Sequence, residues 1–418
     1  MVCGQHNNAS KIGISMHKSH LTKQTILLLG SLYTTQFVGF AFFSVAIIAI
    51  WRKSGMPLEQ LGFLSMLSLV WVVKFLWAPW VDRYVLKNGG DYKKFITIVQ
   101  TLLVVAIVGV SFLDVIEDKA IIIISLIAVG LLSATQDIAT EGLAYKILTK
   151  NERGFGGTLK TIGGILGYII GAGVALSMYE KIGWSATILM LASLTVITLI
   201  QMFFYKEHAS KVEIHSASIS WKIFYKFWNT KDKKLWLIFL ILFPVGMSMA
   251  SGLLVPLLVD VGWNLEKIGF IKGFVGSILG IISAIISGWL LKHYSRMQVL
   301  IGICFFEGFG LLSLLFLYYG NDYIIFNALA ISSVFISYGA SMPIVSALIM
   351  DYIEKSPTTE YALQFAIYML MGVIASGSGV SLSGIFGYDT MIVASSIFSF
   401  ITMGYVYLFL RKVGDERD

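Results

Sequence analysis

The chain has 418 residues, of which 57% are hydrophobic and 13% are charged, and its mean hydropathy is +0.80. This composition excludes a soluble globular protein, because too few polar groups remain to cover a surface that faces water. The formal net charge of +7 would suit a nucleic-acid-binding protein, but the orientation of a membrane protein explains the excess, so we expect no nucleic acid partner.

Apolar runs long enough to cross a lipid bilayer follow one another along the chain. Their length and their lack of alternation predict helices and not the strands of a membrane barrel. The fold class we expect is an all-α integral membrane protein with about 12 transmembrane helices. The predicted spans are about 25–51, 61–80, 95–114, 120–144, 157–178, 184–205, 235–260, 268–291, 297–319, 323–352, 361–384 and 388–410.

Basic residues are distributed unevenly between the two sides of the predicted membrane. About 23 of the 31 Lys and Arg fall in the terminal segments and alternate loops, and about 5 fall in the other loops, which predicts both termini in the cytoplasm. We therefore divide the chain into a cytoplasmic tail (1–24), a six-helix bundle (25–205), a cytoplasmic linker (206–234), a second six-helix bundle (235–410) and a cytoplasmic tail (411–418). The two halves look like diverged copies, as in many transporters.

Three segments resemble the major facilitator superfamily: KFLWAPWVDRY (74–84), SATQDIATEGLAY (133–145) and NERGFGGTLKTIGGILG (151–167). The similarity points to the branch of AmpG-like muropeptide permeases, acetyl-CoA transporters and RhtX/FptX siderophore importers. It implies two bundles that rock about a central cavity. At 418 residues the chain has no room for the additional carboxy-terminal helices common among muropeptide permeases, so the resemblance favours the siderophore importers.

The function implied by this resemblance is import of a ferric siderophore across the bacterial inner membrane, coupled to protons, by a monomer without cofactor or metal. The alternatives are a muropeptide permease of cell-wall recycling and an exporter of small organic molecules. A membrane enzyme is disfavoured because no nucleophile or His–Asp pair falls at membrane depth. The sequence also has no nucleotide-binding loop of the G-x-x-x-x-G-K-[ST] type, which argues against self-powered pumping.

Two carboxylates interrupt the fourth apolar run. Asp137 and Glu141 are four residues apart and therefore share a helix face. Because a charge in hydrocarbon is costly, such groups are functional candidates. We predict that both are proton-coupling residues and that the neighbouring Gln136 contacts substrate. The alternative is a buried pair neutralised by a lysine.

Lys74 and Lys160 are the natural partners of these carboxylates, and either could bind an anionic substrate group. The alternatives are a structural ion pair and snorkelling of the lysine to the cytoplasmic face. Trp71 and Tyr368 are further candidates for substrate contact, against the alternative of lipid-facing aromatic residues. The roles of Glu307 and Asp351, which have no evident partner, stay open.

The resemblance places a gate in charged loops at the cytoplasmic side. Asp82 and Arg83 follow the second span, and Glu152 and Arg153 precede the fifth. The alternative for both pairs is a solvated loop of little energetic weight.

Small residues mark the fifth span as a surface for close helix contact. Gly163 and Gly167 are separated by one helical turn, which lets another backbone approach closely. They are predicted either to belong to the gate or to serve ordinary packing.

Overall fold

The computed structural model describes residues 22–87, 89–148, 153–206, 228, 230–320, 324–352 and 357–410. Within these ranges every regular element is a helix. The predicted terminal tails and the predicted linker lie largely outside the described residues.

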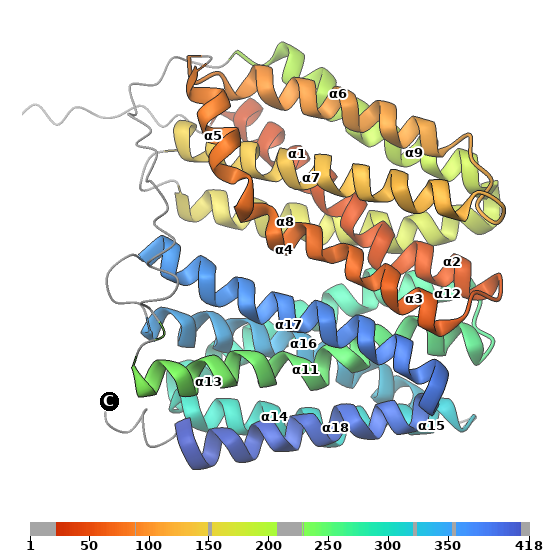
Figure 1. The fold of residues 1–418 in the computed structure, drawn as a ribbon, viewed down its shortest axis with the longest axis vertical. Coiled ribbons are helices and arrows are strands. Elements are labelled where there is room, and N and C mark those ends of the chain that lie inside the picture. The colour runs from red at the N-terminus through yellow and green to blue at the C-terminus, as the bar shows by residue number, and fades with distance from the viewer. Residues whose placement is uncertain are drawn as a thin grey trace, which may run out of the picture.

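The helices before the linker form the N-terminal bundle, the red to lime part of Figure 1. They are α1 (Lys23–Ala41), α2 (Ile47–Lys53), α3 (Leu58–Ser65), α4 (Leu69–Val73), α5 (Ala78–Lys87), α6 (Tyr92–Val110), α7 (Lys119–Ile147), α8 (Arg153–Tyr168) and α9 (Ala175–Phe204). Short π-helical segments join α1 to α2 (Phe42–Ala46) and α8 to α9 (Ile169–Val174).

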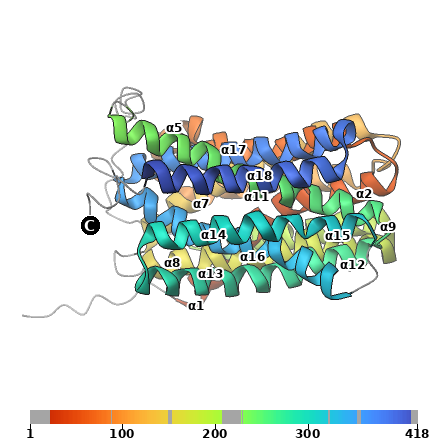
Figure 2. The same ribbon diagram turned by 90° about the horizontal axis from the view of Figure 1, so that it is seen from below.

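The helices after the linker form the C-terminal bundle, the green to blue part of Figure 1. They are α11 (Lys231–Asp260), α12 (Leu265–Phe270), α13 (Gly276–His293), α14 (Arg296–Leu312), α15 (Leu314–Tyr318), α16 (Ile324–Asp351), α17 (Pro357–Phe386) and α18 (Tyr388–Tyr405). A π-helical segment, Ile271–Val275, joins α12 to α13, and another, Val406–Leu410, follows α18. Figure 2, turned by 90°, shows α13, α14 and α18 running lengthwise in the same direction as the rest of the molecule.

Eleven helices in the described ranges are long and apolar enough to cross a membrane. One of them, Leu159–Phe204, has 46 residues, which is about twice what one crossing needs. It is interrupted at Gly183, whose φ of 76° lies in the left-handed region that glycine adopts without strain. This helix therefore supplies two crossings, and the predicted all-helical fold of about 12 spans is confirmed.

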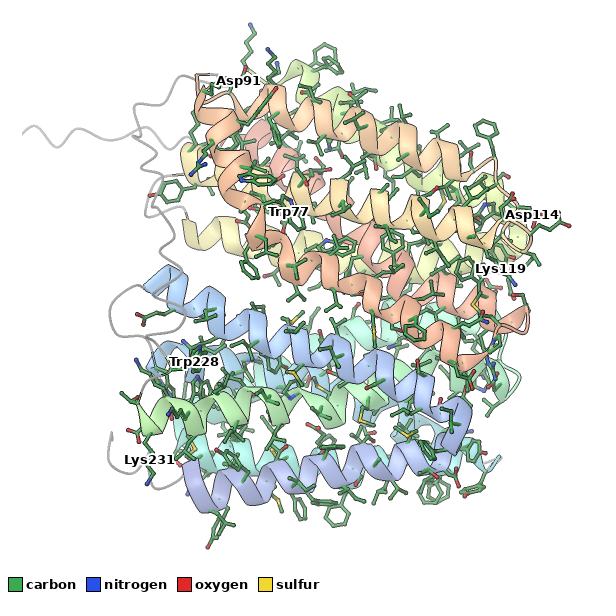
Figure 3. All side chains as sticks on the ribbon, in the orientation of Figure 1. Trp77, Asp91, Asp114, Lys119, Trp228 and Lys231 are labelled. Carbon is green, nitrogen blue, oxygen red and sulfur yellow. The ribbon has the colours of Figure 1, made fainter. Side chains whose placement is uncertain are left out.

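Both bundles extend between the same two ends of the molecule. Figure 3 shows Asp114 and Lys119 at one end, and Asp91, Trp228 and Lys231 at the other. We call the first the Arg52 end, because the loop that follows Arg52 also lies there, and the second the linker end.

The hydrophobic core is shared between the bundles at the Arg52 end and divided at the linker end. One cluster of buried side chains includes Phe43 and Leu61 of the N-terminal bundle together with Leu253 and Ile392 of the C-terminal bundle. The remaining clusters each belong to a single bundle. The main contacts between bundles join α3 to α17, α9 to α12, α2 to α11, and the π-helical segment Ile169–Val174 to the segment Ile271–Val275. The ribbons diverge toward the linker end (Figure 1), so the two bundles meet at the Arg52 end.

Candidate functional site

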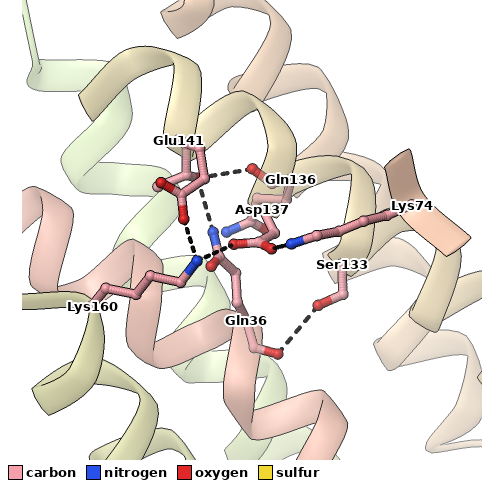
Figure 4. Close-up of polar contacts among 8 residues, drawn as sticks. Gln36, Lys74, Ser133, Gln136, Asp137, Glu141 and Lys160 are labelled. Atoms are coloured by element: carbon pink, nitrogen blue, oxygen red, sulfur yellow. Dashed lines mark hydrogen bonds and ion pairs between the residues drawn. The ribbon is translucent and has the colours of Figure 1, made fainter. Parts of the chain in front are cut away.

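Four charged side chains from three helical segments meet at membrane depth in the N-terminal bundle (Figure 4). Lys74 donates a hydrogen bond to Oδ2 of Asp137, and Lys160 donates one to Oε1 of Glu141. The Nζ atom of Lys160 also lies 4.0 Å from Oδ1 of Asp137. We call these four residues the central charge cluster. Its two ammonium groups balance its two carboxylates.

The second span breaks where Lys74 enters this cluster. Helix α4 ends at Val73, Lys74–Leu76 form a short 3-10 segment, and α5 begins at Ala78. The cause lies in the sequence, because Pro79 has no N–H to donate to the carbonyl of Phe75 four residues earlier. A 3-10 segment inside a long helix is a frequent mark of a functional hinge.

Amide and hydroxyl side chains fix α7 against α1 beneath the cluster. Gln36 Nε2 donates to Thr140 Oγ1 at 2.9 Å, and Gln136 Nε2 lies 3.4 Å from Thr35 Oγ1. Ser133 Oγ donates to the carbonyl of Gln36 at 3.3 Å. Gln136 is fully buried in this conformation, and its Oε1 has no hydrogen-bond partner among the described residues.

The members of the cluster differ in how far water reaches them. The side chain of Asp137 is 8% exposed, whereas those of Lys74, Lys160 and Glu141 are 31%, 37% and 44% exposed. A charged group at this depth avoids lipid and faces a wet space inside the protein. The lysines and Glu141 are therefore accessible to a polar solute, and Asp137 holds the lysines in place.

The two aromatic candidates have different surroundings. Trp71 is partly buried and packs against the rings of Phe40 and Phe43, with centroids 5.4 and 5.9 Å apart. Tyr368 lies in the core of the C-terminal bundle and is 2% exposed. Trp71 lies three residues before Lys74 in the chain, whereas Tyr368 belongs to α17 of the other bundle.

The predicted cytoplasmic gate lies mostly outside the described residues. Arg83 is exposed on α5, but the side chains of Asp82 and Arg153 and the whole of Glu152 fall outside the description.

Gly163 and Gly167 lie against α1 of their own bundle. A Cβ atom on Gly167 would come within 2.4 Å of the carbonyl oxygen of Thr34, and one on Gly163 within 2.7 Å of Cβ of Tyr33. These glycines therefore allow close packing of α8 on α1, and their part in a gate stays a prediction.

Asp351, for which the sequence shows no evident partner, forms an ion pair with Arg296 at the linker end. The pair joins α16 to α14 within the C-terminal bundle, so Asp351 has a structural position there.

A gate that the sequence interpretation missed closes the Arg52 end. The guanidinium of Arg52 donates from Nε to Oδ1 of Asp260 at 2.6 Å and from Nη2 to Oδ2 at 2.5 Å. Tyr388 donates to Oδ2 of the same carboxylate at 2.7 Å. A two-pronged contact of this kind is among the stronger hydrogen-bonded ion pairs, and here it links the two bundles.

A second part of this gate joins α9 to the start of α12. Oε1 of Glu180 accepts a hydrogen bond from Lys53 at 2.7 Å and one from the backbone N–H of Leu265 at 3.1 Å. Lys181 pairs with Glu266 at 2.7 Å. Glu180 thus satisfies an N–H group at a helix start in the other bundle, where a negative charge is favoured. In the sequence, the residues of this gate show only as charged residues at or near the ends of helices, beside short polar loops.

Glycines bring the bundles into backbone contact beside the gate. A Cβ on Gly62 would lie 2.0 Å from Oγ of Ser381, and a Cβ on Gly273 would lie 2.7 Å from Cα of Gly173. Both contacts cross between bundles, unlike those of Gly163 and Gly167.

Comparisons with known proteins agree with this architecture. The profile of the family described as Major Facilitator Superfamily matches residues 29–380. The anhydromuropeptide permease of Escherichia coli (strain K12) is 25% identical over 248 residues, which are 58% of this chain and 50% of that protein. The chain thus spans half the length of that relative. The putative transporter AmpG 2 of Rickettsia typhi is 22% identical over 86% of this chain and 88% of its own.

Two solved structures share the fold. The nucleoside transporter NupG superposes with a TM-score of 0.67 at 15% identity and covers 92% of this chain and 98% of its own. A POT family transporter in complex with 5-aminolevulinic acid gives a TM-score of 0.69 at 12% identity, over 93% and 96% of the two chains. At these identities the likeness concerns the fold alone.

Proposed function

This chain belongs to the Major Facilitator Superfamily, and from that premise we propose that it is a secondary transporter that imports a muropeptide-like solute into the bacterial cytoplasm. The relatives reported above are a muropeptide permease and an AmpG transporter. They support the muropeptide alternative better than the siderophore import that the sequence resemblance favoured. The membrane is the bacterial inner membrane, as for AmpG-like proteins.

The observation that carries the proposal is the central charge cluster. A muropeptide is a sugar that bears a short peptide, so it presents carboxylates and polar groups together. Lys74 and Lys160 are exposed enough to exchange their carboxylate partners for those of a solute. Exchange of one ion pair for another keeps charge balanced throughout, which avoids leaving an unpaired charge at membrane depth.

We propose that the linker end faces the cytoplasm, in line with the excess of basic residues there. With the bundles joined at the Arg52 end, the molecule is then open to the cytoplasm and closed to the outside. Opening of the Arg52–Asp260 contact and closure of the linker end would expose the central charge cluster to the other side.

Proton coupling remains part of this proposal, with Asp137 and Glu141 as the candidates taken from the sequence. Each carboxylate is held by an ammonium group. Either would take up a proton only after a carboxylate of the solute had replaced it at Lys74 or Lys160. A monomer that works without metal or cofactor is the simplest form of this mechanism.

Uptake into proteoliposomes tests the proposal. The purified chain should take up a labelled anhydromuropeptide, and Lys74→Gln and Lys160→Gln should each lower uptake at least about tenfold, equivalent to about 1.4 kcal/mol. Lys87→Gln, which changes an exposed lysine on α5, is the matched control and should transport normally. Uptake of a ferric siderophore but not of the muropeptide would restore the first expectation from the sequence.

A further inference from the structure

Glu307 is a buried carboxyl group that the central charge cluster does not include. It lies on α14 and is 2% exposed. Its Oε1 accepts a hydrogen bond from Ser399 of α18 at 2.7 Å, and the backbone N–H of Met247 on α11 faces the same carboxyl group. Its Oε2 is buried and has no hydrogen-bond partner in the part of the chain that is described.

No charged side chain faces Glu307 from the helices packed around it. The charged residues on these helices lie near helix ends, the nearest along each being Lys234 and Asp260 on α11, Arg296 on α14, Asp351 on α16, Glu360 on α17 and Asp389 on α18. Met247, where α11 faces the carboxyl, is 13 residues and so about 20 Å from both Lys234 and Asp260.

Lys272, a buried lysine of the same bundle, does not neutralise Glu307 either. Its Nζ lies 3.5 Å from the carbonyl of Ser251 and 5.4 Å from the ring centre of Phe335. Because an unpaired carboxylate in a membrane protein core is costly, these surroundings favour the neutral, protonated form of Glu307.

The space between α11 and Oε1 of the carboxyl group is too small for a metal ion. A single Cβ atom on Gly246 would lie 2.4 Å from Oγ of Ser399 and 3.2 Å from Oε1 of Glu307. Helix α11 thus packs directly on this oxygen. A sodium ion needs several oxygen ligands around it, whereas a proton needs no additional volume.

Two tyrosines are electrostatic neighbours in the direction from Glu307 to the N-terminal bundle. Tyr368 of α17 lies within electrostatic range of both Glu307 and Tyr338, and its hydroxyl is buried without a hydrogen-bond partner among the described residues. Tyr338, in the middle of α16, is 43% exposed and lies within electrostatic range of Tyr168 of the N-terminal bundle. These electrostatic neighbours therefore extend from the carboxyl group of Glu307 to the N-terminal bundle. The other titratable neighbour is Cys304, one turn away on α14.

We propose that Glu307 is a second proton-binding site of this transporter, separate from Asp137 and Glu141. An O–H bond forms at Oε2 with a proton from the aqueous phase on one side. The same bond breaks when the bundles rock, and the proton passes to water between the bundles through Tyr368 and Tyr338. The inference rests on the proposed transport function but on no particular substrate.

Infrared spectroscopy of the purified full chain in lipid tests the site without any substrate. The wild-type protein at neutral pH should show the carbonyl stretch of a protonated carboxyl group, and Glu307→Gln should remove it. Ser399→Ala should keep the band but shift its frequency, because the hydrogen bond to Oε1 is lost. Glu117→Gln, in an exposed loop, should leave the band unchanged. A band that persists in Glu307→Gln overturns the proposal.

Transport assays then test coupling at this site. In proteoliposomes, the rate at which Glu307→Gln exchanges anhydromuropeptide should stay within about twofold of the wild-type rate. The accumulation that a pH gradient drives should be at least about tenfold lower than in the wild type. Asp137→Asn should lose both activities. The proposal is overturned if Glu307→Gln accumulates substrate at the wild-type level. It is also overturned if the wild-type protein accumulates substrate in a sodium buffer but not in a choline buffer. If wild type transports no muropeptide, the substrate assignment fails while the infrared result still decides the proton site.

Discussion

Asp137 and Glu307 are both carboxyl groups at membrane depth, but the two bundles surround them in opposite ways. Asp137 receives one ammonium group directly and lies 4.0 Å from a second. Glu307 receives a hydrogen bond from a serine hydroxyl and lies beside the backbone N–H of Met247, and none of its partners among the described residues is charged. The lysines that contact Asp137 are partly exposed to water, whereas helix α11 packs directly on Glu307.

The difference separates two tasks of a coupled transporter. A charge that is balanced by neighbours can exchange partners with a solute without passing through an unpaired state. A carboxyl group without a neighbouring charge must instead gain or lose a proton whenever its surroundings change. The N-terminal bundle is therefore suited to binding, with proton uptake tied to the exchange of carboxylates, and the C-terminal bundle is suited to proton uptake without a partner charge.

The largest effect is expected from Asp137→Ala. The substitution leaves Lys74 and Lys160 without their shared carboxylate, which should cost about 3 kcal/mol of stability and reduce transport to about 1% or less. Thermal unfolding in detergent and uptake into proteoliposomes measure the two effects.

Asp137→Glu is the control for this experiment, because it retains the charge and should recover much of the stability. If Asp137→Ala were as stable as wild type, the charge balance of the N-terminal bundle would not depend on Asp137. This result would contradict the distinction between a charge-balanced Asp137 and an unbalanced Glu307.

The next effect concerns helix packing inside the N-terminal bundle. Gly167→Ala should destabilise the protein by about 1–3 kcal/mol, because its Cβ would lie 2.4 Å from the carbonyl oxygen of Thr34. Gly39→Ala, whose Cβ would have no neighbour within 4 Å, is the matched control. The yield of folded protein on size-exclusion chromatography distinguishes the alternatives. A gate role predicts normal yield with impaired transport.

The sequence predicts the spans well because hydrophobic length alone defines a crossing. It also identifies the four members of the central charge cluster, since a charged residue is conspicuous inside an apolar run. It does not show that Lys74 and Lys160 reach the same carboxylate, because that depends on where the helix breaks before Pro79.

The gate at the Arg52 end could not be predicted in the same way. Arg52 and Asp260 are 208 residues apart, and each lies at a helix end where charged residues are ordinary. The same limit applies to Glu307. Its sequence position raises the question of a function, but only the packing of α11, α17 and α18 shows that no charge balances it.

A smaller effect is expected where glycines join the two bundles. Gly62→Ala places a Cβ within 2.4 Å of the carbonyl oxygen of Gly377 and so opposes closure at the Arg52 end, by about 1–2 kcal/mol. The distance between spin labels at positions 87 and 231, across the linker end, should shift toward shorter values. Gly280→Ala, with no atom within 4 Å of its Cβ, should leave the distance distribution unchanged.

The smallest effect is expected for the ion pair of the gate, Arg52–Asp260. The two side chains are 20% and 27% exposed, so water screens part of their attraction. Asp260→Asn removes the charge but keeps a hydrogen-bond acceptor for Arg52 and Tyr388, and Arg52 retains its contact with the carbonyl of Met56 at 2.9 Å. We therefore expect the state closed at the Arg52 end to lose only about 0.5–1 kcal/mol, a two- to fivefold change in its population relative to the opposite state.

The same spin-label pair measures this change, and its dependence on salt identifies the cause. In the wild type, raising the ionic strength should weaken the pair and move the distance distribution in the direction of Asp260→Asn, whereas the variant itself should respond less. The exchanged pair, Arg52→Asp with Asp260→Arg, should recover part of the wild-type distribution, because the attraction is restored with its polarity reversed. Lys181→Gln provides the comparison within the gate. Its pair with Glu266 is about half exposed, so its effect should be smaller than that of Asp260→Asn. An equal or larger effect of Lys181→Gln would show that the main electrostatic contact of the gate is the pair with Glu266 on α12 and not the pair with Asp260 on α11.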